Sequence, residues 1–319
     1  MKRRVQPHSN RVFDVVVAGL AVVDVIGRPL NFGKLPRPGG LELLDSVTLT
    51  TGGNVSNCGI DLAKLGFRVA AITRVGNDDF GEFIRNQYEH YGIESSGVIV
   101  DARKQTSATI VCVGRDGERT FLHTRGCLQS FRARDVLNSL ALVRKAAIFA
   151  FGYLGLLPET EREFERLFRS IKEQTTAKIL LDTGGTPKRQ PALLRSFLPF
   201  VDYFIPSYEE AVALTGCTTP EEIVKYLFDA GAPNVVGVKL GSKGCYISHL
   251  GFAAYIPPIR VRNVVDATGA GDAFVAGFLG ATLRNRDPFS AAKIGNAVAA
   301  SCVTAVGAST AITSLKQYV

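Results

Sequence analysis

The residues that could do chemistry lie in the segment DATGAGDAF, at positions 266–274. The apolar run that follows has a helix-like spacing, which puts Gly269, Ala270 and Gly271 at the amino end of a helix. Such an end exposes unpaired N–H groups and the positive pole of the helix dipole, so it can bind an anion. Asp272 would repel that anion, but it can take a proton from a hydroxyl group that attacks it. We interpret the segment as an anion site beside a base; the alternative is an ordinary glycine-rich turn followed by a first-turn acid.

Composition and charge describe an ordinary globular protein. The chain has 319 residues, of which 46% are hydrophobic and 21% are charged, so it is long enough to bury a large core. Its net charge of +8 comes from basic residues that are scattered, apart from the run Lys2-Arg3-Arg4 near the start. A scattered cationic surface suits small phosphorylated ligands better than nucleic acid, so we expect no nucleic-acid partner.

Cysteine usage and the first apolar segment bear on location. The six cysteines occur singly, without a C-x-x-C pair, and most lie among apolar or small residues. We expect buried free thiols of a reduced cytoplasm rather than a zinc site or a disulfide framework. The apolar segment at 12–27 contains Asp14 and Asp24 and is too short to span a bilayer. We therefore interpret it as a buried strand and expect no membrane partner.

Strands and helices alternate along most of the chain, and this alternation must position the candidate residues. The expected strands are 13–20, 69–76, 146–152, 178–184, 201–207, 235–240 and 245–250, with a hairpin at 108–124 that turns at 115–117. The expected helices are 54–65, 79–91, 158–175, 209–215, 221–230, the run after 272, and 288–307.

This order predicts right-handed β-α-β units on a parallel sheet. We predict an α/β fold with a doubly wound, mostly parallel sheet flanked by helices, in one domain at 13–319 behind a flexible tail at 1–12. A small β element is expected from about 26–50 and 104–126, where prolines, glycines and alternating residues occur.

Polar and glycine-marked stretches follow several expected strands, where ligands bind in open parallel sheets. They are Asp24, the run Gly52-Gly53-Asn54 with Asn57, the pair Gly241 and Gly244, and the segment 269–272. A Walker loop is absent, and no G-x-G-x-x-G follows the first strand, which disfavours a nicotinamide enzyme.

Two segments, GGNVSNCGIDLAKLGFRVAAITRVG at 52–76 and VVDATGAGDAFVAGFL at 264–279, resemble the ribokinase-like (PfkB) carbohydrate kinases. VKLGSKG, FIPSYEEAVALTG and NAVAASCVTAVGA support the likeness, which covers residues 13–310. It implies a kinase that uses ATP and Mg²⁺ to phosphorylate a primary hydroxyl group of a small sugar or sugar-like molecule. The early β element would be the lid, which closes over the site and excludes water.

The resemblance also implies roles on the acceptor side. Asp272 matches the catalytic base, and residues 269–271 match the anion hole for the migrating phosphoryl group. The matching sugar-binding positions are Asp24, Gly52, Gly53, Asn54 and Asn57. A strand-end cap is the alternative for Asp24, and a hydrogen bond at a helix start is the alternative for Asn57. We also expect Thr109, His123 and Arg125 of the hairpin to line the pocket.

On the nucleotide side, the family's adenine and phosphate positions match Lys239, Gly241, Gly244 and Asn296. The alternatives are a solvated strand-end charge for Lys239 and a water-facing position for Asn296. Glu210 matches the acid of an N-x-x-E segment linked to Mg²⁺, although Ser207 replaces the asparagine of that segment. Some members also hold a monovalent cation such as K⁺ at positions that match Asp266, Thr268, Cys302, Ala305 and Gly307.

Departures from the family pattern bear on the substrate. Val22 and Asn54 stand where ribokinases proper have an asparagine and a lysine. Ribose is therefore not our first choice, and a hexose, a keto-sugar, a sugar acid or a nucleoside remains open. A nucleoside kinase and a non-catalytic metabolite-binding regulator are the alternative functions. The exposed lid edges favour pairing of two copies through the lid.

Overall fold

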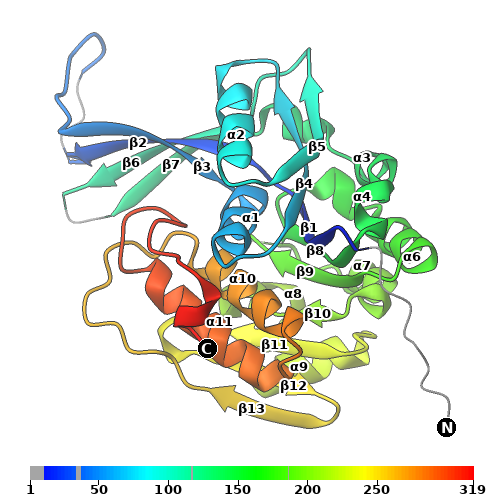
Figure 1. The fold of residues 1–319 in the computed structure, drawn as a ribbon. Helices are drawn as coiled ribbons and strands as arrows, with labels where there is room; N and C mark the ends of the chain where they lie inside the picture. The colour runs from blue at the N-terminus through cyan, green and yellow to red at the C-terminus, as the bar shows by residue number, and fades with distance from the viewer. Residues whose placement is uncertain (1–10, 34–36, 116–117, 186) are drawn as a thin grey trace, which may run out of the picture.

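The computed structural model describes residues 11–33, 37–115, 118–185 and 187–319. Its main sheet has nine strands in the order β13-β12-β11-β10-β9-β8-β1-β4-β5 (Figure 1). In chain order these strands are β1 (Phe13–Gly19), β4 (Val69–Gly76), β5 (Glu94–Asp101), β8 (Ala146–Leu154), β9 (Lys178–Thr183), β10 (Tyr203–Phe204), β11 (Val235–Lys239), β12 (Cys245–His249) and β13 (Phe252–Ile256). The strands from β5 to β11 run parallel, and β12 and β13 add antiparallel pairs at one edge. The predicted doubly wound, mostly parallel sheet is confirmed.

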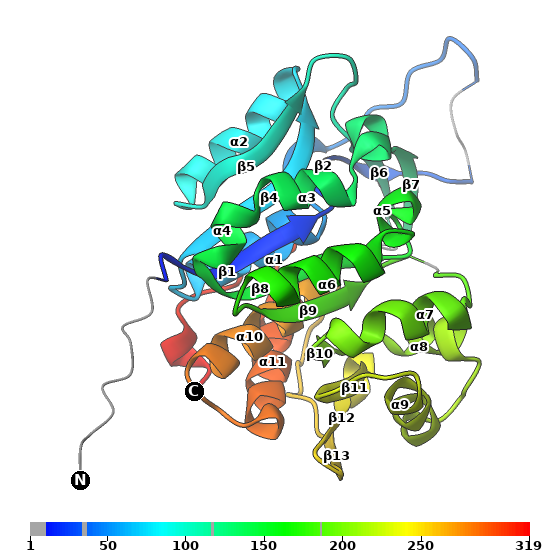
Figure 2. The same cartoon turned by 90° about the vertical axis from the view of Figure 1, so that its right-hand side faces the viewer.

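Helices cover both faces of this sheet (Figures 1 and 2). One face carries α1 (Asn54–Lys64), α2 (Asp79–His90), α10 (Ala270–Leu283) and α11 (Pro288–Cys302). The other carries α3 (Ala133–Asn138), α4 (Leu140–Arg144), α6 (Phe164–Gln174), α7 (Pro191–Phe197), α8 (Tyr208–Thr215) and α9 (Pro220–Asp229). Alternation along β1 feeds both cores, because Val15 and Val17 pack on the first face while Val16 and Ala18 pack on the second.

A second sheet of four strands forms the lid, in the order β3-β2-β6-β7. Its strands are β2 (Val22–Leu30), β3 (Ser46–Gly52), β6 (Ala108–Gly114) and β7 (Arg119–Thr124). The chain enters β2 directly after the carboxyl end of β1 and reaches β6 after the carboxyl end of β5. The lid is therefore attached at the edge of the main sheet where ligands bind in this class of fold.

The apolar segment at 12–27 was predicted to be a buried strand. It forms two strands instead, β1 and β2, which are separated at Leu20 and Ala21. Gly19 has a φ of 131° there, and the side chain of Asn54 bonds to Leu20 N at 2.8 Å and to Ala18 O at 3.0 Å. This amide holds the chain at the point where it leaves the main sheet for the lid.

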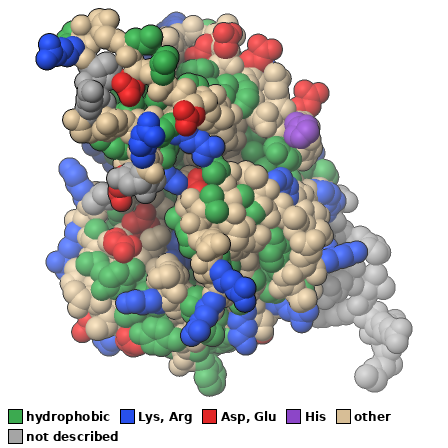
Figure 3. Space-filling view, turned by 90° about the vertical axis from the view of Figure 1, so that its left-hand side faces the viewer, with side chains coloured by type: hydrophobic (Ala, Val, Ile, Leu, Met, Phe, Trp, Pro, Cys, Tyr) green, Lys and Arg blue, Asp and Glu red, His purple; other side chains and the backbone are tan. Residues whose placement is uncertain are grey.

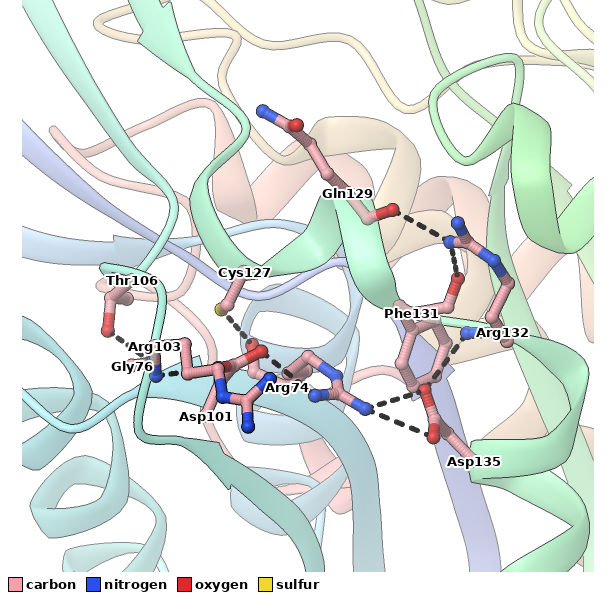
Figure 4. A network of polar contacts seen from close by, with 10 residues as sticks. All are labelled: Arg74, Gly76, Asp101, Arg103, Thr106, Cys127, Gln129, Phe131, Arg132 and Asp135. Carbon is pink, nitrogen blue, oxygen red and sulfur yellow. Dashed lines mark hydrogen bonds and ion pairs between the residues drawn. The ribbon is translucent and has the colours of Figure 1, made fainter.

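Polar contacts fix the base of the lid, as Figure 4 shows. Arg74, on β4, contacts Asp101 at 3.0 Å and Asp135 at 3.1 Å, and its carbonyl accepts from the Cys127 thiol. Thr106, just before β6, receives the Gly76 amide at 2.8 Å. The segments that enter and leave the lid hairpin are thus held against β4.

Some predicted elements differ in extent. The helix predicted at 158–175 is divided into α5 (Pro158–Glu161) and α6, because the Glu161 carboxylate accepts from Gly155 N and Leu157 N and turns the first segment back. The strand predicted at 201–207 is only β10, and Pro206 beyond it has no amide hydrogen to pair. The sequence did not predict β5, β13, α3, α4 or α7.

Short 3₁₀ helices complete the chain: η1 (Gly126–Ser130), η2 (Leu198–Phe200), η3 (Gly241–Lys243) and η4 (Leu315–Gln317). Residues 1–10 of the predicted tail and residues 116–117 of the predicted hairpin turn lie outside the described residues. Within the described part of the chain, no helix combines the length and the apolar character that crossing a bilayer requires.

Candidate active site

The amino end of α10 is built as the sequence predicted. Gly269 caps the helix with a φ of 75°, and a Cβ placed on it would lie 2.3 Å from the Ala308 Cβ, so only glycine fits. Gly269, Ala270 and Gly271 are partly exposed, whereas Asp272 is only 5% exposed. The first-turn amides are therefore open to an anion, and the carboxylate lies behind them.

One oxygen of Asp272 is held by two donors. Asn57 Nδ2 donates to Oδ2 at 3.0 Å and the Tyr153 hydroxyl donates to the same atom at 2.6 Å. Oδ1 is buried and has no hydrogen-bond partner among the described residues. Burial and the charge of Asp182 raise the pKa of Asp272 to about 6, although both donors and Lys239 act against the rise. Asp272 thus has one fixed oxygen and one oxygen free to accept a proton.

A buried ion pair lies beside this end of α10. Lys239 Nζ, at the end of β11, is 2.7 Å from Asp182 Oδ1, at the end of β9, and both side chains are less than 10% exposed. Burial lowers the pKa of Lys239, but the charges of Asp182, Glu210 and Asp272 outweigh it, so the pKa is raised. A Cβ placed on Gly271 would lie 3.5 Å from Nζ, so the ammonium group adjoins the first-turn amides. The solvated-charge alternative for Lys239 is wrong.

Glu210 lies next to this pair, at the start of α8. Its carboxylate accepts from the Thr183 hydroxyl and from Ser207 N, the latter at 3.3 Å. The charges of Glu210 and Asp182 both raise the pKa of Lys239, so the two carboxylates lie near the same ammonium group. Within the described residues no group of three or more acids, histidines or cysteines could hold a metal ion. Two carboxylates fit Mg²⁺, which keeps several waters and takes its other ligands from phosphates.

A cavity of about 530 Å³ lies between the lid and the main domain. Asp24, Thr50 and Asn57 line it, and Asn57 connects it to Asp272 through the bond described above. Asp272 itself does not line this cavity. Asp24 lies within β2 and pairs with Thr50 and Thr109 on both sides, so the strand-end alternative is wrong. Burial raises the pKa of Asp24, and a hydrogen bond from Thr109 opposes the rise.

The paired glycines shape this side of the site. A Cβ on Gly52 would lie 2.2 Å from Asp24 Oδ2, and a Cβ on Gly53, whose φ is 82°, would lie 2.4 Å from Leu20 O. Gly52 therefore leaves room for the Asp24 carboxylate, and Gly53 allows the close approach of α1 to the chain after β1. The side-chain amide of Asn54 bonds to backbone on both sides, so we leave Asn54 out of the proposed substrate contacts.

Of the three lid residues expected at the pocket, Thr109 and His123 lie in one row with Asp24, and Arg125 follows the end of β7. Thr109 pairs with Asp24 across β6 and β2, and with His123 across β6 and β7. Thr109 Oγ1 is 3.1 Å from His123 Nδ1. Burial, followed by the charge of Arg125, lowers the pKa of His123. None of the three is among the residues that line the cavity, and Thr109 reaches it through Asp24.

On the predicted nucleotide side, the residues have different surroundings. Gly241 has a φ of 57° and open space where a Cβ would lie, whereas a Cβ on Gly244 would lie 2.1 Å from Ile256 O. Asn296 is buried, and its amide donates to Pro257 O at 2.9 Å and to Ile256 O at 3.3 Å. The water-facing alternative for Asn296 is wrong, because this side chain holds the segment after β13.

The residues predicted to surround a monovalent cation are already bonded within the protein. Asp266 Oδ1 accepts from Arg119 at 2.6 Å and from Thr268 N at 2.7 Å, and Oδ2 accepts from Gly307 N at 3.0 Å. The Thr268 carbonyl accepts from the Cys302 thiol. Ala305 N lies 3.5 Å from the Cys302 carbonyl. In this arrangement the oxygen atoms that would bind K⁺ do not fit a bound ion, because the Arg119 guanidinium group already pairs with the Asp266 carboxylate.

Comparison with known proteins shows the family to which the chain belongs. The family model described as pfkB family carbohydrate kinase matches residues 12–315. The chain belongs to the PfkB family of carbohydrate kinases. This kinase is 28% identical to fructokinase-1 of Oryza sativa subsp. japonica over 303 residues, which cover 88% of the chain and 92% of that protein.

Two further relatives show the range of the likeness. The kinase is 28% identical to 2-dehydro-3-deoxygluconokinase of Bacillus subtilis over 282 residues, covering 84% of the chain and 85% of that enzyme. The structure of Arabidopsis thaliana ribokinase complexed with ribose and ATP has a TM-score of 0.82 at 24% identity. That alignment covers 96% of this kinase and 97% of the ribokinase, and it shows a shared fold.

Three residues of the candidate site were missed by sequence reasoning. Tyr153 and Asp182 lie at the carboxyl ends of β8 and β9. Their position after parallel strands was a usable signal, because ligands bind at that edge. Arg119 gave no such signal, since its contact with Asp266 depends on where the lid lies over the main domain.

Proposed function

We propose that the protein transfers a phosphoryl group from ATP to a primary hydroxyl group of a small sugar or sugar-like molecule, by in-line attack. The observation that carries the proposal is the position of Asp272: its free Oδ1 lies behind the open amides of residues 269–271 and near the Lys239 ammonium group. A protein that only binds a metabolite would not need a base at this position, so the non-catalytic regulator is the weaker of the two functions.

In the proposed reaction, Asp24 and Asn57 hold the acceptor in the cavity under the lid, with its hydroxyl group directed to Asp272. Asp272 Oδ1 takes the proton of that hydroxyl group as the oxygen attacks. The amides of residues 269–271 and the Lys239 ammonium group stabilise the negative charge that spreads over the transferred group. When bound, ATP supplies this group, and Mg²⁺ near Glu210 and Asp182 neutralises part of its charge.

The cavity and the relatives both bear on the acceptor. Relatives named for fructose and for 2-dehydro-3-deoxygluconate align along most of the chain. We therefore propose a hexose, a keto-sugar or a sugar acid. A nucleoside is the second candidate, because the apolar side chains Ile26, Val111 and Phe121 form one wall of the cavity, against which a base could pack.

The test is an assay of ADP release with ATP and Mg²⁺ against pentoses, hexoses, sugar acids and nucleosides. We expect acceptor-dependent release with one of these classes. The matched control is Asp272→Asn, which keeps the size of the side chain and should lower kcat by about 10² to 10⁴. The proposed function would be contradicted if no acceptor increased the release of ADP, or if Asp272→Asn kept a near-normal turnover.

The remaining expectations concern surroundings and partners. All six cysteines are free, in keeping with a reducing compartment, and we propose the cytoplasm.

Lys and Arg side chains are interspersed with Asp and Glu on the face drawn in Figure 3. We therefore keep the prediction of no nucleic-acid partner. Binding to DNA and RNA at graded salt would test it, because phosphate contacts give a steep salt dependence.

A further inference from the structure

Arg119 joins the lid to the loop that leads into the anion hole. It begins β7, near the outer end of the lid hairpin, and its guanidinium group bonds to Asp266 Oδ1 and to the Thr268 hydroxyl. Asp266 and Thr268 are distant from Arg119 in sequence, by 147 and 149 positions. Gly269, the cap of α10, directly follows Thr268. One lid side chain therefore reaches the residues next to the first-turn amides.

The ion pair between Arg119 and Asp266 is largely buried, unlike an ion pair at the surface. Asp266 is 7% exposed, and the Arg119 side chain is 25% exposed at the wall of the cavity. Burial raises the pKa of Asp266, but the amides of Gly307 and Thr268 and the Arg119 guanidinium group outweigh it and lower the pKa. The carboxylate is thus charged, and Arg119 is the cation that faces it.

Asp266 also connects two segments of the main domain. Its Oδ1 receives the Thr268 amide and its Oδ2 receives the Gly307 amide, so it ties the loop before α10 to the segment after α11. Without a cation, a nearly buried carboxylate would be desolvated with only dipoles as partners. The conformation of the loop therefore depends on a positive charge at this place.

We propose that Arg119 is a positioning residue: its guanidinium group serves as a built-in cation for Asp266 and Thr268, and it orders the anion-hole loop when the lid lies over the site. The inference rests on the proposed function, since it assigns a role in the same reaction. It also implies that the protein does not need K⁺ at this loop, because the donor set is already satisfied. Lid position and anion-hole geometry are then set by one contact.

The experiment compares wild type with Arg119→Ala, Arg119→Lys and Arg103→Ala. Arg103→Ala is the matched control, because it removes the same charge from the exposed loop that leads into the lid, outside the cavity lining. Each protein is assayed in KCl and in tetramethylammonium chloride at equal ionic strength, with and without guanidinium chloride at millimolar concentration. Thermal unfolding is measured in the same salts without any substrate.

We expect Arg119→Ala to lower kcat roughly ten- to a hundredfold with a smaller change in the KM for the acceptor, as for loss of hydrogen bonds to a charged group. K⁺ or guanidinium should restore part of that rate, and Arg119→Lys should retain more of it than Arg119→Ala. K⁺ should raise the Tm of Arg119→Ala above its value in tetramethylammonium, while wild type and Arg103→Ala unfold alike in both salts.

Three results would overturn the proposal: a wild-type rate or Tm that depends on K⁺ as strongly as that of Arg119→Ala, a normal rate for Arg119→Ala, or a loss that neither cation restores. The unfolding comparison needs no acceptor. If the wild type phosphorylates nothing, the proposed function fails, whereas the role of Arg119 as a cation is still decided by the salt dependence of Tm.

Discussion

The Tyr153 hydroxyl group donates a hydrogen bond of 2.6 Å to Oδ2 of Asp272. Burial and the negative charge of Asp272 raise the pKa of Tyr153 well above its usual value, so the phenol stays protonated and remains a donor. The donor favours the charged form of Asp272 and acts against the effect of burial. Tyr153 therefore holds Oδ2 while Oδ1 has no hydrogen-bond partner among the described residues, and it favours the ionised carboxylate at neutral pH.

The pH dependence of kcat/KM should show how burial and the Tyr153 hydrogen bond together set the pKa of Asp272. The base must be ionised, and the pKa of Asp272 is about 6, so we expect kcat/KM to fall tenfold per pH unit below that pH. Tyr153→Phe removes a donor to the charged form and raises the pKa. The acid limb should then move to higher pH by about one unit. A pH series of initial rates at low acceptor concentration measures the limb.

Asp182→Asn is the control, because it should shift the pKa of Asp272 in the opposite direction to Tyr153→Phe. The charge of Asp182 raises the pKa of Asp272, so its removal should move the acid limb to lower pH. Acid limbs that coincide in wild type, Tyr153→Phe and Asp182→Asn would show that another group titrates, and the role of Asp272 as the base would have to be abandoned.

Gly52→Ala should separate acceptor binding from nucleotide binding. The added Cβ would lie 2.2 Å from Asp24 Oδ2 and 3.0 Å from Val22 Cγ2, so Asp24 must move. We expect the KM for the acceptor to rise about tenfold, the effect of losing a hydrogen bond to a charged group, with little change in the KM for ATP. Steady-state kinetics with each substrate varied in turn measure both constants.

Gly59→Ala, in the middle of α1, is the control for Gly52→Ala. Its Cβ would meet Ile93 Cδ1 at 3.7 Å, an ordinary contact, and alanine favours the helix by about 0.5–1 kcal/mol. Gly59→Ala should keep both KM values and raise the free energy of unfolding slightly. An unchanged acceptor KM in Gly52→Ala would remove Asp24 from the proposed acceptor site.

Lys239→Met should destabilise the fold as well as slow the reaction. It leaves the Asp182 carboxylate buried without its cation, a change that typically costs about 3–5 kcal/mol. Lys239→Met combined with Asp182→Asn removes both charges and should recover part of that loss without recovering activity. Urea unfolding followed by circular dichroism measures the free energies. Equal stability of the single and double variants would contradict a coupled buried pair.

The sequence predicted the amino end of α10 better than the contacts around it. Residues 269–272 were found because small residues before an apolar helix have a local chemical meaning. Asp24 and Asn57 were marked by their positions after expected strands, and the family likeness added their roles. Asn54 has its amide bonded to backbone that no local pattern indicates. The alternation of elements predicted the main sheet, because burial on both faces makes its strands nearly continuous apolar runs.

What sequence reasoning missed depends on tertiary geometry. Tyr153, Asp182 and Arg119 come from three elements, and each meets its partner only when the sheet order and the lid position are known. The break between β1 and β2 was missed for a related reason. An apolar run of this length reads as one strand, whereas the turn is made by Gly19 and a side chain of α1.

The outer face of the lid carries a row of apolar side chains. Leu49, Val25, Ile110 and Leu122 are register partners across all four lid strands. Leu49, Ile110 and Leu122 are 43%, 51% and 59% exposed, on the face opposite the row that holds Asp24. A contiguous apolar face on a small sheet is typical of an interface between proteins, and we predict that a second copy of this chain covers it.

Light scattering after size exclusion should therefore give the mass of a dimer for the wild type. Leu122→Glu, which puts a charge at the exposed end of the row, should give the mass of a monomer with an unchanged Tm within a few degrees, because the side chain has little packing to lose. Leu250→Glu is the control, since Leu250 is 75% exposed in the turn between β12 and β13, far from the lid in the chain. It should remain dimeric. A monomeric wild type at micromolar concentration, or a dimer that survives Leu122→Glu, would exclude this face as the contact between copies.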